Sequence, residues 1–432
     1  MTILGASGLP QEVLQRGREI AELPARLGGL GIRSSTRTRE AAYWASWADA
    51  LEMIHKRNPE LAGRFLATLE ASNASNDGCL HELKLAAQRL DEEWFDNRPA
   101  WRALAEGVRP PPLPTTHGAD ERTPGWQYFA SSTREIFART KLLQSRCRHT
   151  NASMRSQAGP GASLAIMSAP SQKGYSLTPE QFQSTMRRRL RWPLPLVAAT
   201  CEGCGERLDE LGNHYAACMR SGRPKIRASA VETTVAQICR EAGARVRTNV
   251  RLRDLNVAVP ASDERRIEVV ASGLPAFGGA QLAVDVTVRS PLTAAGNPKP
   301  RAAWQDGAVA ESARADKESS YPELASGSRC RLVVLAIETG GRFSHETCEF
   351  IRQLAWCKAQ SAPAFLRGSV ATAFEKRWGR LLAIVVASSV VDSLLLEKDA
   401  LACAPAQAVR EPWLLAVLAD GHDDVAGDWP TA

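Results

Sequence analysis

The stretch of sequence that decides the fold is Gln281-Leu282-Ala283-Val284-Asp285-Val286-Thr287-Val288-Arg289. Every second residue is a large aliphatic one. Because side chains alternate across a strand, this pattern predicts a β-strand with one continuous apolar face. The other face is mixed and carries Asp285 at its centre. Aspartate is depleted in strands, so a specific role is expected for this residue.

A second strand is predicted just before the first, over residues 265–270. It turns Glu268 away from its aliphatic face, and the Gly- and Pro-containing segment 273–279 predicts a turn into an antiparallel hairpin. If both apolar faces point to one core, Glu268 and Asp285 lie side by side. Neighbouring carboxylates repel unless a cation joins them, and such oxygen ligands suit Mg²⁺. The pair predicts a magnesium site, although two solvated strand carboxylates would give the same pattern.

Four residues of metal-binding types are concentrated upstream of the hairpin. They are Cys201, Cys204, His214 and Cys218, spaced C-x2-C-x9-H-x3-C. A C-x2-C turn lets two thiolates meet one ion, and a set of four ligands with no open position predicts a closed, structural Zn²⁺ site. Unrelated buried thiols are the alternative. However, three of the ten cysteines and one of the seven histidines fall within this short segment, which favours a zinc knuckle.

A run of arginines precedes the knuckle. Thr178-Pro179-Glu180 has a hydroxyl cap, a proline at the first turn and an acid near the positive end of the dipole, so it predicts a helix start. Successive helical residues turn by about 100°, so the arginines of this helix cannot share one face and some must be solvated. We expect the run to bind nucleic-acid phosphates, with ordinary solvation as the alternative. The arginines are Arg187, Arg188, Arg189 and Arg191.

Length and composition predict more than one domain. The chain has 432 residues, 44% of them hydrophobic, and 54 Lys and Arg against 47 Asp and Glu, for a net charge of +7. This balance favours polyanionic partners without identifying one. The fold class expected is α+β multidomain: a helical amino-terminal region, a small zinc knuckle and an α/β domain with a central mixed sheet. The expected boundaries are 1–108 for the helical region, 109–130 for a Pro-rich linker, 131–200 for a basic helical linker, 201–220 for the knuckle, 225–400 for the α/β domain and 401–432 for a tail.

One strongly apolar segment, residues 381–391, approaches the composition of a membrane span. Charged residues precede and interrupt it, so it falls short of a bilayer width and a buried helix is predicted. The sequence near Met1 lacks a basic start followed by an apolar core, so no secretory signal is expected. We therefore expect an intracellular protein without a membrane partner.

Together, these features resemble the carboxy-terminal region of non-LTR (LINE-type) retrotransposon proteins that carry a restriction-enzyme-like endonuclease of the PD-(D/E)xK superfamily. The resemblance covers nearly the whole chain. It implies a reverse-transcriptase thumb or connector for the amino-terminal helices and a restriction-endonuclease-like fold for the α/β domain. No Tyr-x-Asp-Asp polymerase signature occurs, so polymerisation by this chain alone is not expected. The segments that carry the resemblance are residues 23–34 (LPARLGGLGIRS), Ala42-Tyr43-Trp44, the CCHC knuckle, Glu268 with Asp285-Val286-Thr287-Val288, and Lys317 with Tyr321.

The resemblance also implies residue roles. Glu268 corresponds to the first acid of the superfamily pattern and Asp285 to the second, while Thr287 stands at the usual lysine position. In the retrotransposon group a lysine from the following helix takes that role, and Lys317, four residues before Tyr321, matches its place. Such a lysine would orient the attacking water, although a solvated lysine at a helix end is the alternative.

The resemblance also implies a role for one further acid, and a function for the whole protein. Glu232 matches an additional metal-holding acid, although a glutamate in a helix needs no such role. The protein would be a Mg²⁺-dependent nuclear endonuclease that nicks a DNA target and leaves a 3′-hydroxyl to prime reverse transcription of the element RNA. The alternative is a catalytically inactive, zinc-dependent nucleic-acid-binding remnant, which the absent polymerase palm and the altered acid motif favour.

Overall fold

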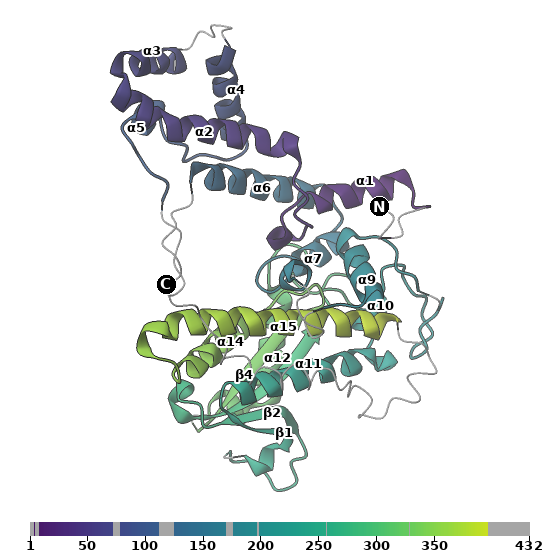
Figure 1. Ribbon diagram of the computed structural model, residues 1–432. Coiled ribbons are helices and arrows are strands. Elements are labelled where there is room, and N and C mark those ends of the chain that lie inside the picture. Colours follow the sequence, from purple (N-terminus) through teal and green to yellow (C-terminus); the bar gives the residue numbers. More distant parts are fainter. Residues whose placement is uncertain are drawn as a thin grey trace. The chain divides into compact units, whose positions relative to one another are not determined.

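The computed structural model describes residues 4, 8–71, 78–111, 125–169, 176–196, 198–255, 257–327 and 329–395. The chain forms two compact units (Figure 1). Ala21–Arg146 makes one, here called the helical unit, and Met1–Ile20 with Cys147–Ala432 makes the other, the sheet unit. These limits differ from the expected boundaries at 108, 130 and 200. Most of the expected linker and the whole expected tail lie outside the described residues.

The helical unit is built from helices around an aromatic centre. Trp44 is fully buried, and the rings of Phe95 and Trp126 meet it edge-on at centroid distances of 5.2 and 5.9 Å. Such edge contacts add to the stabilisation from burial of these large rings. Helical structure in this part of the chain is as predicted. Its elements are η2 (Ala25–Leu27), α2 (Ser35–Arg57), α3 (Pro59–Glu70), α4 (Gly78–Glu92), α5 (Trp101–Ala105) and α6 (Trp126–Gln144).

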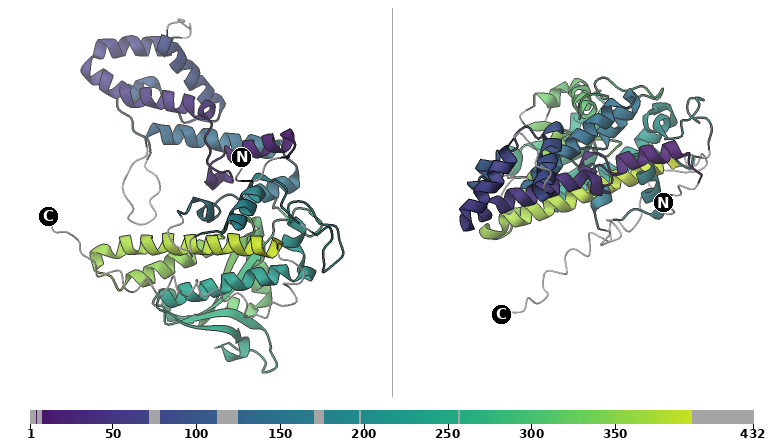
Figure 2. Two further views of the ribbon diagram at one scale, coloured as in Figure 1. Left: turned by 45° about the vertical axis from the view of Figure 1, so that its right-hand side comes forward. Right: turned by 90° about the horizontal axis from the view of Figure 1, so that it is seen from above.

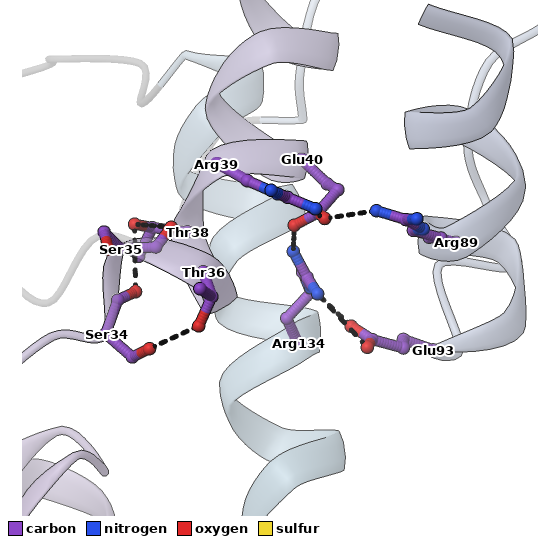
Figure 3. A network of polar contacts seen from close by, with 9 residues as sticks. All are labelled: Ser34, Ser35, Thr36, Thr38, Arg39, Glu40, Arg89, Glu93 and Arg134. Atoms are coloured by element: carbon purple, nitrogen blue, oxygen red, sulfur yellow. Dashed lines mark hydrogen bonds and ion pairs between the residues drawn. The ribbon is translucent and has the colours of Figure 1, made fainter. Parts of the chain in front are cut away.

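A buried ion-pair network ties three of these segments together (Figure 3). The Glu40 carboxylate of α2 accepts hydrogen bonds from Arg134 of α6 at 2.6 Å and from Arg89 of α4 at 2.7 Å. Arg134 also pairs with Glu93, just after α4. Burial raises the pKa of Glu40, but hydrogen bonds from Arg134 and Arg39 outweigh this effect and hold it at about 2. Glu40 is therefore ionised, and the network stabilises the packing of α2 against α4 and α6.

The sheet unit places helices before and after a four-stranded sheet. Before the sheet come α1 (Gln11–Ala21, whose last residue falls in the helical unit), α7 (Arg148–Ser156), α8 (Leu164–Met167), α9 (Pro179–Leu190), α10 (Asn213–Ala217), η4 (Met219–Ser221) and α11 (Arg223–Glu241). The sheet and its connections are β1 (Arg245–Arg251), η5 (Leu252–Asp254), β2 (Arg266–Ser272), η6 (Ala276–Gly279), β3 (Gln281–Arg289), α12 (Ala308–Ser320), α13 (Pro322–Ala325) and β4 (Cys330–Glu338). They are followed by α14 (His345–Ala359), η7 (Ala364–Leu366) and α15 (Arg367–Leu395).

The sheet is mixed, as the sequence predicts. Its strand order is β1-β2-β3-β4; the β1–β2 and β2–β3 pairs are antiparallel, and the β3–β4 pair is parallel. The predicted hairpin between β2 and β3 is thus confirmed. Its pairing is short, however, and runs from Ala271↔Leu282 only to Val269↔Val284. The next residues along the two strands are Glu268 and Asp285, so the two acids lie where β2 and β3 begin to separate.

Helices cover both faces of the sheet. One face packs against α11, α14 and α15, and the other against α12 (Figure 2). A strand covered on both faces is buried along most of its length, and in β3 only positions 281, 287 and 289 are half-buried. The alternation predicted for β3 therefore separates two cores rather than a core from solvent.

Helix α15 accounts for the apolar segment near residue 390. Among the described residues, one helix, spanning 364–395, has the length and hydropathy to cross a membrane, but 72% of its most apolar window is buried in the fold. It packs along α11 and α14 and contributes Trp378, Leu382 and Val386 to the core. Packing inside the protein explains its composition, as predicted for a buried helix.

Candidate functional site

The four knuckle residues converge on one point. The ligating atoms of Cys201, Cys204, His214 and Cys218 all lie within 4.8 Å of one another. The Sγ of Cys218 is 3.7 Å from that of Cys204 and 3.9 Å from that of Cys201. Tetrahedral zinc with Zn–S bonds of about 2.3 Å separates its sulfurs by about 3.8 Å, so the spacing fits this ion. The group forms one Cys₃His site, as the spacing predicts.

Local backbone geometry explains why this segment brings its ligands together. The amide of Gly205 donates to Cys201 O at 2.8 Å, and Gly205 has a φ of +77°, which glycine adopts without strain. A Cβ on Gly203 would lie 2.3 Å from the carbonyl oxygen of Arg220, so this position requires glycine for close packing. The two glycines let the C-x2-C turn close against the segment that carries Cys218.

The histidine of the knuckle is held in the tautomer that a metal needs. His214 Nδ1 is 2.9 Å from the carbonyl oxygen of Ala294, which can only accept, so Nδ1 carries the proton. This leaves the lone pair on Nε2, which lies 3.2 Å from Cys204 Sγ and faces the other ligands. Burial raises the pKa of the Cys201 thiol to about 11, so zinc binding would have to displace its proton.

The predicted catalytic residues form a second cluster, at the point where β2 and β3 separate. Asp285 is fully buried, and Lys317 of α12 donates from Nζ to its Oδ2 at 2.6 Å. Glu268, on β2, and Glu232, on α11, are close enough to Asp285 to influence its charge environment and to be influenced by it. Four side chains from β2, β3, α11 and α12 thus share one site.

Negative charge is under-compensated in this cluster. Burial, and next the charge of Asp285, raises the pKa of Glu268 to about 8. The same two causes raise the pKa of Glu232. Asp285 Oδ1 and Glu268 Oε2 are buried and have no hydrogen-bond partner among the described residues. The oxygens of Asp285 and Glu268 that lack donors could hold a hard divalent cation such as Mg²⁺, but among the described residues the three acids do not form a close set of ligand atoms like that of the knuckle.

Tyr321 lies at the edge of the cluster but its hydroxyl is turned to the backbone. The hydroxyl donates to the carbonyl of Arg266 at 3.1 Å, and Lys317 Nζ lies 5.9 Å from the ring centroid. Burial, with the charges of Asp285 and Glu268, raises the pKa of Tyr321 to about 12. The phenol therefore stays protonated, and its hydroxyl bonds to the backbone rather than to an acid of the cluster.

The arginine run is not a solvated stripe, contrary to the sequence expectation that some of its members are solvent-exposed. Arg189 is 3% exposed and donates to Ala162 O at 2.9 Å. Arg187 donates to the carbonyl of Pro193 at 2.9 Å, and it is half-buried like Arg188 and Arg191. The helix start itself is as predicted, with a capping box between Thr178 and Gln181. Tertiary packing, which a helical pattern does not reveal, takes two of the four arginines into contacts within the chain.

Sequence reasoning did not identify the residues that attach the knuckle to the sheet unit. Arg223 of α11 donates to Glu202 Oε1 at 2.7 Å and stacks on the Tyr215 ring at 3.7 Å. Tyr215 donates its hydroxyl to the same carboxylate. An acid inside the C-x2-C turn and an arginine five residues after the last ligand were visible in the sequence. Their pairing depends on how the knuckle folds back on α11.

No family model matches the chain, and no significant match to it exists among curated proteins. The interpretation of the Cys₃His cluster and of the acidic cluster therefore depends on their geometry alone.

Proposed function

We propose that the sheet unit is a Mg²⁺-dependent endonuclease that nicks DNA. The observation that carries this proposal is the convergence of Glu268, Asp285 and Lys317, with a 2.6 Å contact between the lysine and the fully buried aspartate. Buried acids with perturbed pKa values are concentrated at functional sites, because catalysis needs groups whose pKa is matched to their task. The fold around them, a mixed sheet with helices on both faces, suits a restriction-endonuclease-like domain.

The chain's residues would divide the reaction between them. Asp285 and Glu268 would hold the metal through the oxygens that have no partner among the described residues, and Glu232, whose pKa is raised by burial and by the charge of Asp285, would add negative charge nearby. Bound Mg²⁺ supplies positive charge to the phosphate and lowers the pKa of water. Lys317 orients the attacking water and screens the scissile phosphate. The water oxygen bonds to phosphorus and the P–O3′ bond breaks. The water gives up one proton as it attacks and the leaving 3′ oxygen takes one up, so the products are a 3′-hydroxyl and a 5′-phosphate.

The biological setting belongs to the same proposal. We infer a nuclear protein derived from a non-LTR retrotransposon, in which the nick primes reverse transcription of the element RNA and the zinc knuckle helps to hold nucleic acid. The Cys₃His set immediately before the nuclease-like domain supports this inference. The reverse-transcriptase thumb or connector assignment for the helical unit is part of it.

A plasmid assay tests the catalytic proposal. Purified full chain with Mg²⁺ should convert supercoiled plasmid to open circles, and the nicked ends should be extendable by a DNA polymerase. Asp285→Asn should abolish nicking. Asp254→Asn is the matched control, because it removes the same charge from an exposed site on η5. Equal nicking by Asp285→Asn and wild type would refute the proposal.

A binding module without nuclease activity is the second candidate. Thr287, at the superfamily's usual lysine position, favours it. In that case wild type and Asp285→Asn would both be inert toward plasmid while both retain DNA binding, and zinc removal would abolish that binding.

A further inference from the structure

Three arginines of the sheet unit carry buried guanidinium nitrogens without partners. They are Arg188 of α9, Arg191 at its carboxyl end and Arg227 of α11. Arg227 is 2% exposed and donates only through Nη2, to the carbonyls of Ala216 and Val288. Within the described part of the chain, no acceptor reaches Arg188 Nη1, Arg191 Nε and Nη2, or Arg227 Nε and Nη1.

Asp209 acts on Arg188 and Arg191 through its charge but forms no ion pair with either of them among the described residues. Asp209 is the one carboxylate whose charge acts on both Arg188 and Arg191. Its oxygens instead accept backbone amides of the knuckle, from His214 at 2.7 Å and from two further residues, Leu211 and Asn213, at 3.1 and 3.0 Å. Asp209 thus holds the start of α10 and leaves the guanidinium groups without an ion pair among the described residues.

Arg223 is a buried arginine whose guanidinium group has an acid, carbonyl oxygens and an aromatic ring as partners. It is 2% exposed, and its guanidinium pairs with Glu202, donates to the carbonyls of Ser393 and Leu394 and stacks on Tyr215. It lies at the start of α11, four residues before Arg227. Arg188, Arg191 and Arg227 differ from Arg223 in that each has at least one buried nitrogen without a partner among the described residues.

Water molecules alone would not compensate the charge of these guanidinium groups. A buried water can accept a hydrogen bond, but it brings no negative charge, and a buried cation without an anion is strongly unfavourable. Burial lowers the pKa of Arg188 and of Arg191 to about 10 and that of Arg227 to about 9, and mutual repulsion contributes for Arg188 and Arg227. All three therefore keep their charge at neutral pH, and an anion would remove the imbalance.

We propose that Arg188, Arg191 and Arg227 form a binding site for a phosphate group, supplied by a nucleic-acid backbone. Guanidinium donors match phosphate oxygens in geometry as well as charge. Arg188 and Arg191 are half-buried as residues, but their nitrogens without partners are buried, so a phosphate would have to enter the space between the guanidinium groups. Arg187 and Arg189 are left out, because none of their nitrogens is among the buried ones without a partner, and both donate to carbonyls of the chain. The site rests on nucleic-acid binding in the proposed function and does not require cleavage.

The first experiment measures the thermal stability of the full chain with and without inorganic phosphate, at constant ionic strength in chloride. At about ten times its Kd, phosphate should raise the Tm of wild type by about 3 °C. Arg191→Gln should remove this response and leave the Tm without phosphate unchanged or higher, because an unpaired buried charge is gone. Arg240→Gln, on an exposed position of α11, is the matched control and should respond like wild type.

The second experiment identifies the source of the phosphate. Binding of a fluorescent single-stranded oligonucleotide should weaken about tenfold in Arg191→Gln, and the slope of log Kd against log salt should fall by about one. Arg240→Gln should change neither. A phosphate-dependent Tm with unchanged oligonucleotide affinity would overturn the nucleic-acid source and leave a site for a small phosphate compound.

The result that overturns the whole proposal is a structural one. If Arg191→Gln lowers the Tm without phosphate, and inorganic phosphate stabilises this variant as much as wild type, the arginines are packing residues. Nicking activity is read separately, so a chain that fails to nick can still support the phosphate site, and a chain that nicks can still refute it.

Discussion

Replacing Glu268 with glutamine is expected to stabilise the protein while abolishing the nicking activity that we propose. Glu268 lies beside Asp285 in a partly buried site, and its own Oε2 has no partner among the described residues. Glutamine has nearly the same shape and carries no charge, so it removes the repulsion between the two acids. A residue that lowers the stability of the folded protein is retained when function needs it, as is expected of a catalytic metal ligand.

The size of the effect follows from the pKa of Glu268, which is raised from 4.5 to about 8. The folded state binds this proton more tightly than the unfolded state, so the penalty is absent below pH 4.5, grows as pH rises and is complete above pH 8. Each pKa unit corresponds to about 1.4 kcal/mol, so the penalty at pH 7.5 has an upper limit of about 4 kcal/mol. Solvent screening at this half-buried position reduces the expected gain for Glu268→Gln to about 1–2 kcal/mol.

Urea unfolding of both proteins at pH 5 and pH 7.5, without and with Mg²⁺, measures this effect. Without metal, the stabilisation of Glu268→Gln relative to wild type should be small at pH 5 and about 1–2 kcal/mol at pH 7.5. Mg²⁺ should stabilise wild type at pH 7.5 and have little effect on the variant. A variant that is less stable than wild type by the same amount at both pH values would refute the account, because Glu268 would then be an ordinary packing residue.

Three further outcomes are expected. Purified protein should contain about one equivalent of zinc, and His214→Ala should lose it and lower the Tm, since zinc contributes roughly 10–16 kcal/mol of apparent binding energy in such sites; equal zinc content in both proteins by atomic emission would contradict the Cys₃His assignment. Lys317→Met should abolish nicking and destabilise the chain by up to about 3–5 kcal/mol, because buried Asp285 loses its cation. In urea unfolding, Lys317→Arg should keep most of the stability of wild type. A Lys317→Arg protein as unstable as Lys317→Met would argue against the ion pair. Arg134→Met should destabilise the helical unit by about 3–5 kcal/mol. In wild type, the stabilisation from the low pKa of Glu40 should be lost as pH falls from 4.5 toward 2, and a variant with the same acid sensitivity in circular dichroism would contradict this role.

Short-range pattern was sufficient for several parts of this protein. The alternation of 281–289 predicts β3, and the glycines between 273 and 279 predict the antiparallel connection to β2. Ligand spacing predicts the Cys₃His cluster, because the four residues fall within one short segment and the turn chemistry acts locally. The cap at Thr178 is likewise a local hydrogen-bond device and is found as predicted.

Contacts between distant segments were not readable in the same way. Lys317 follows Asp285 by 32 positions, and only the packing of α12 on β3 and β4 brings its Nζ within 2.6 Å of the carboxylate. The sequence suggested this lysine through a family resemblance and not through any spacing rule. The division of the chain at Arg146, rather than near residue 108, likewise follows from the packing of α6 against α2.

The arginine run separates the two kinds of information. The sequence by itself determined that four arginines sit on one capped helix and that they cannot share a face. Only the tertiary structure decided that Arg189 is buried against a carbonyl, while Arg188 and Arg191 lie with Arg227, from another helix, without an acid partner in the part of the chain that the structure describes. Helical periodicity specifies the direction of a side chain from its own axis. Whether that direction leads to solvent, a carbonyl or another cation depends on which element packs there, and that is set by the whole core.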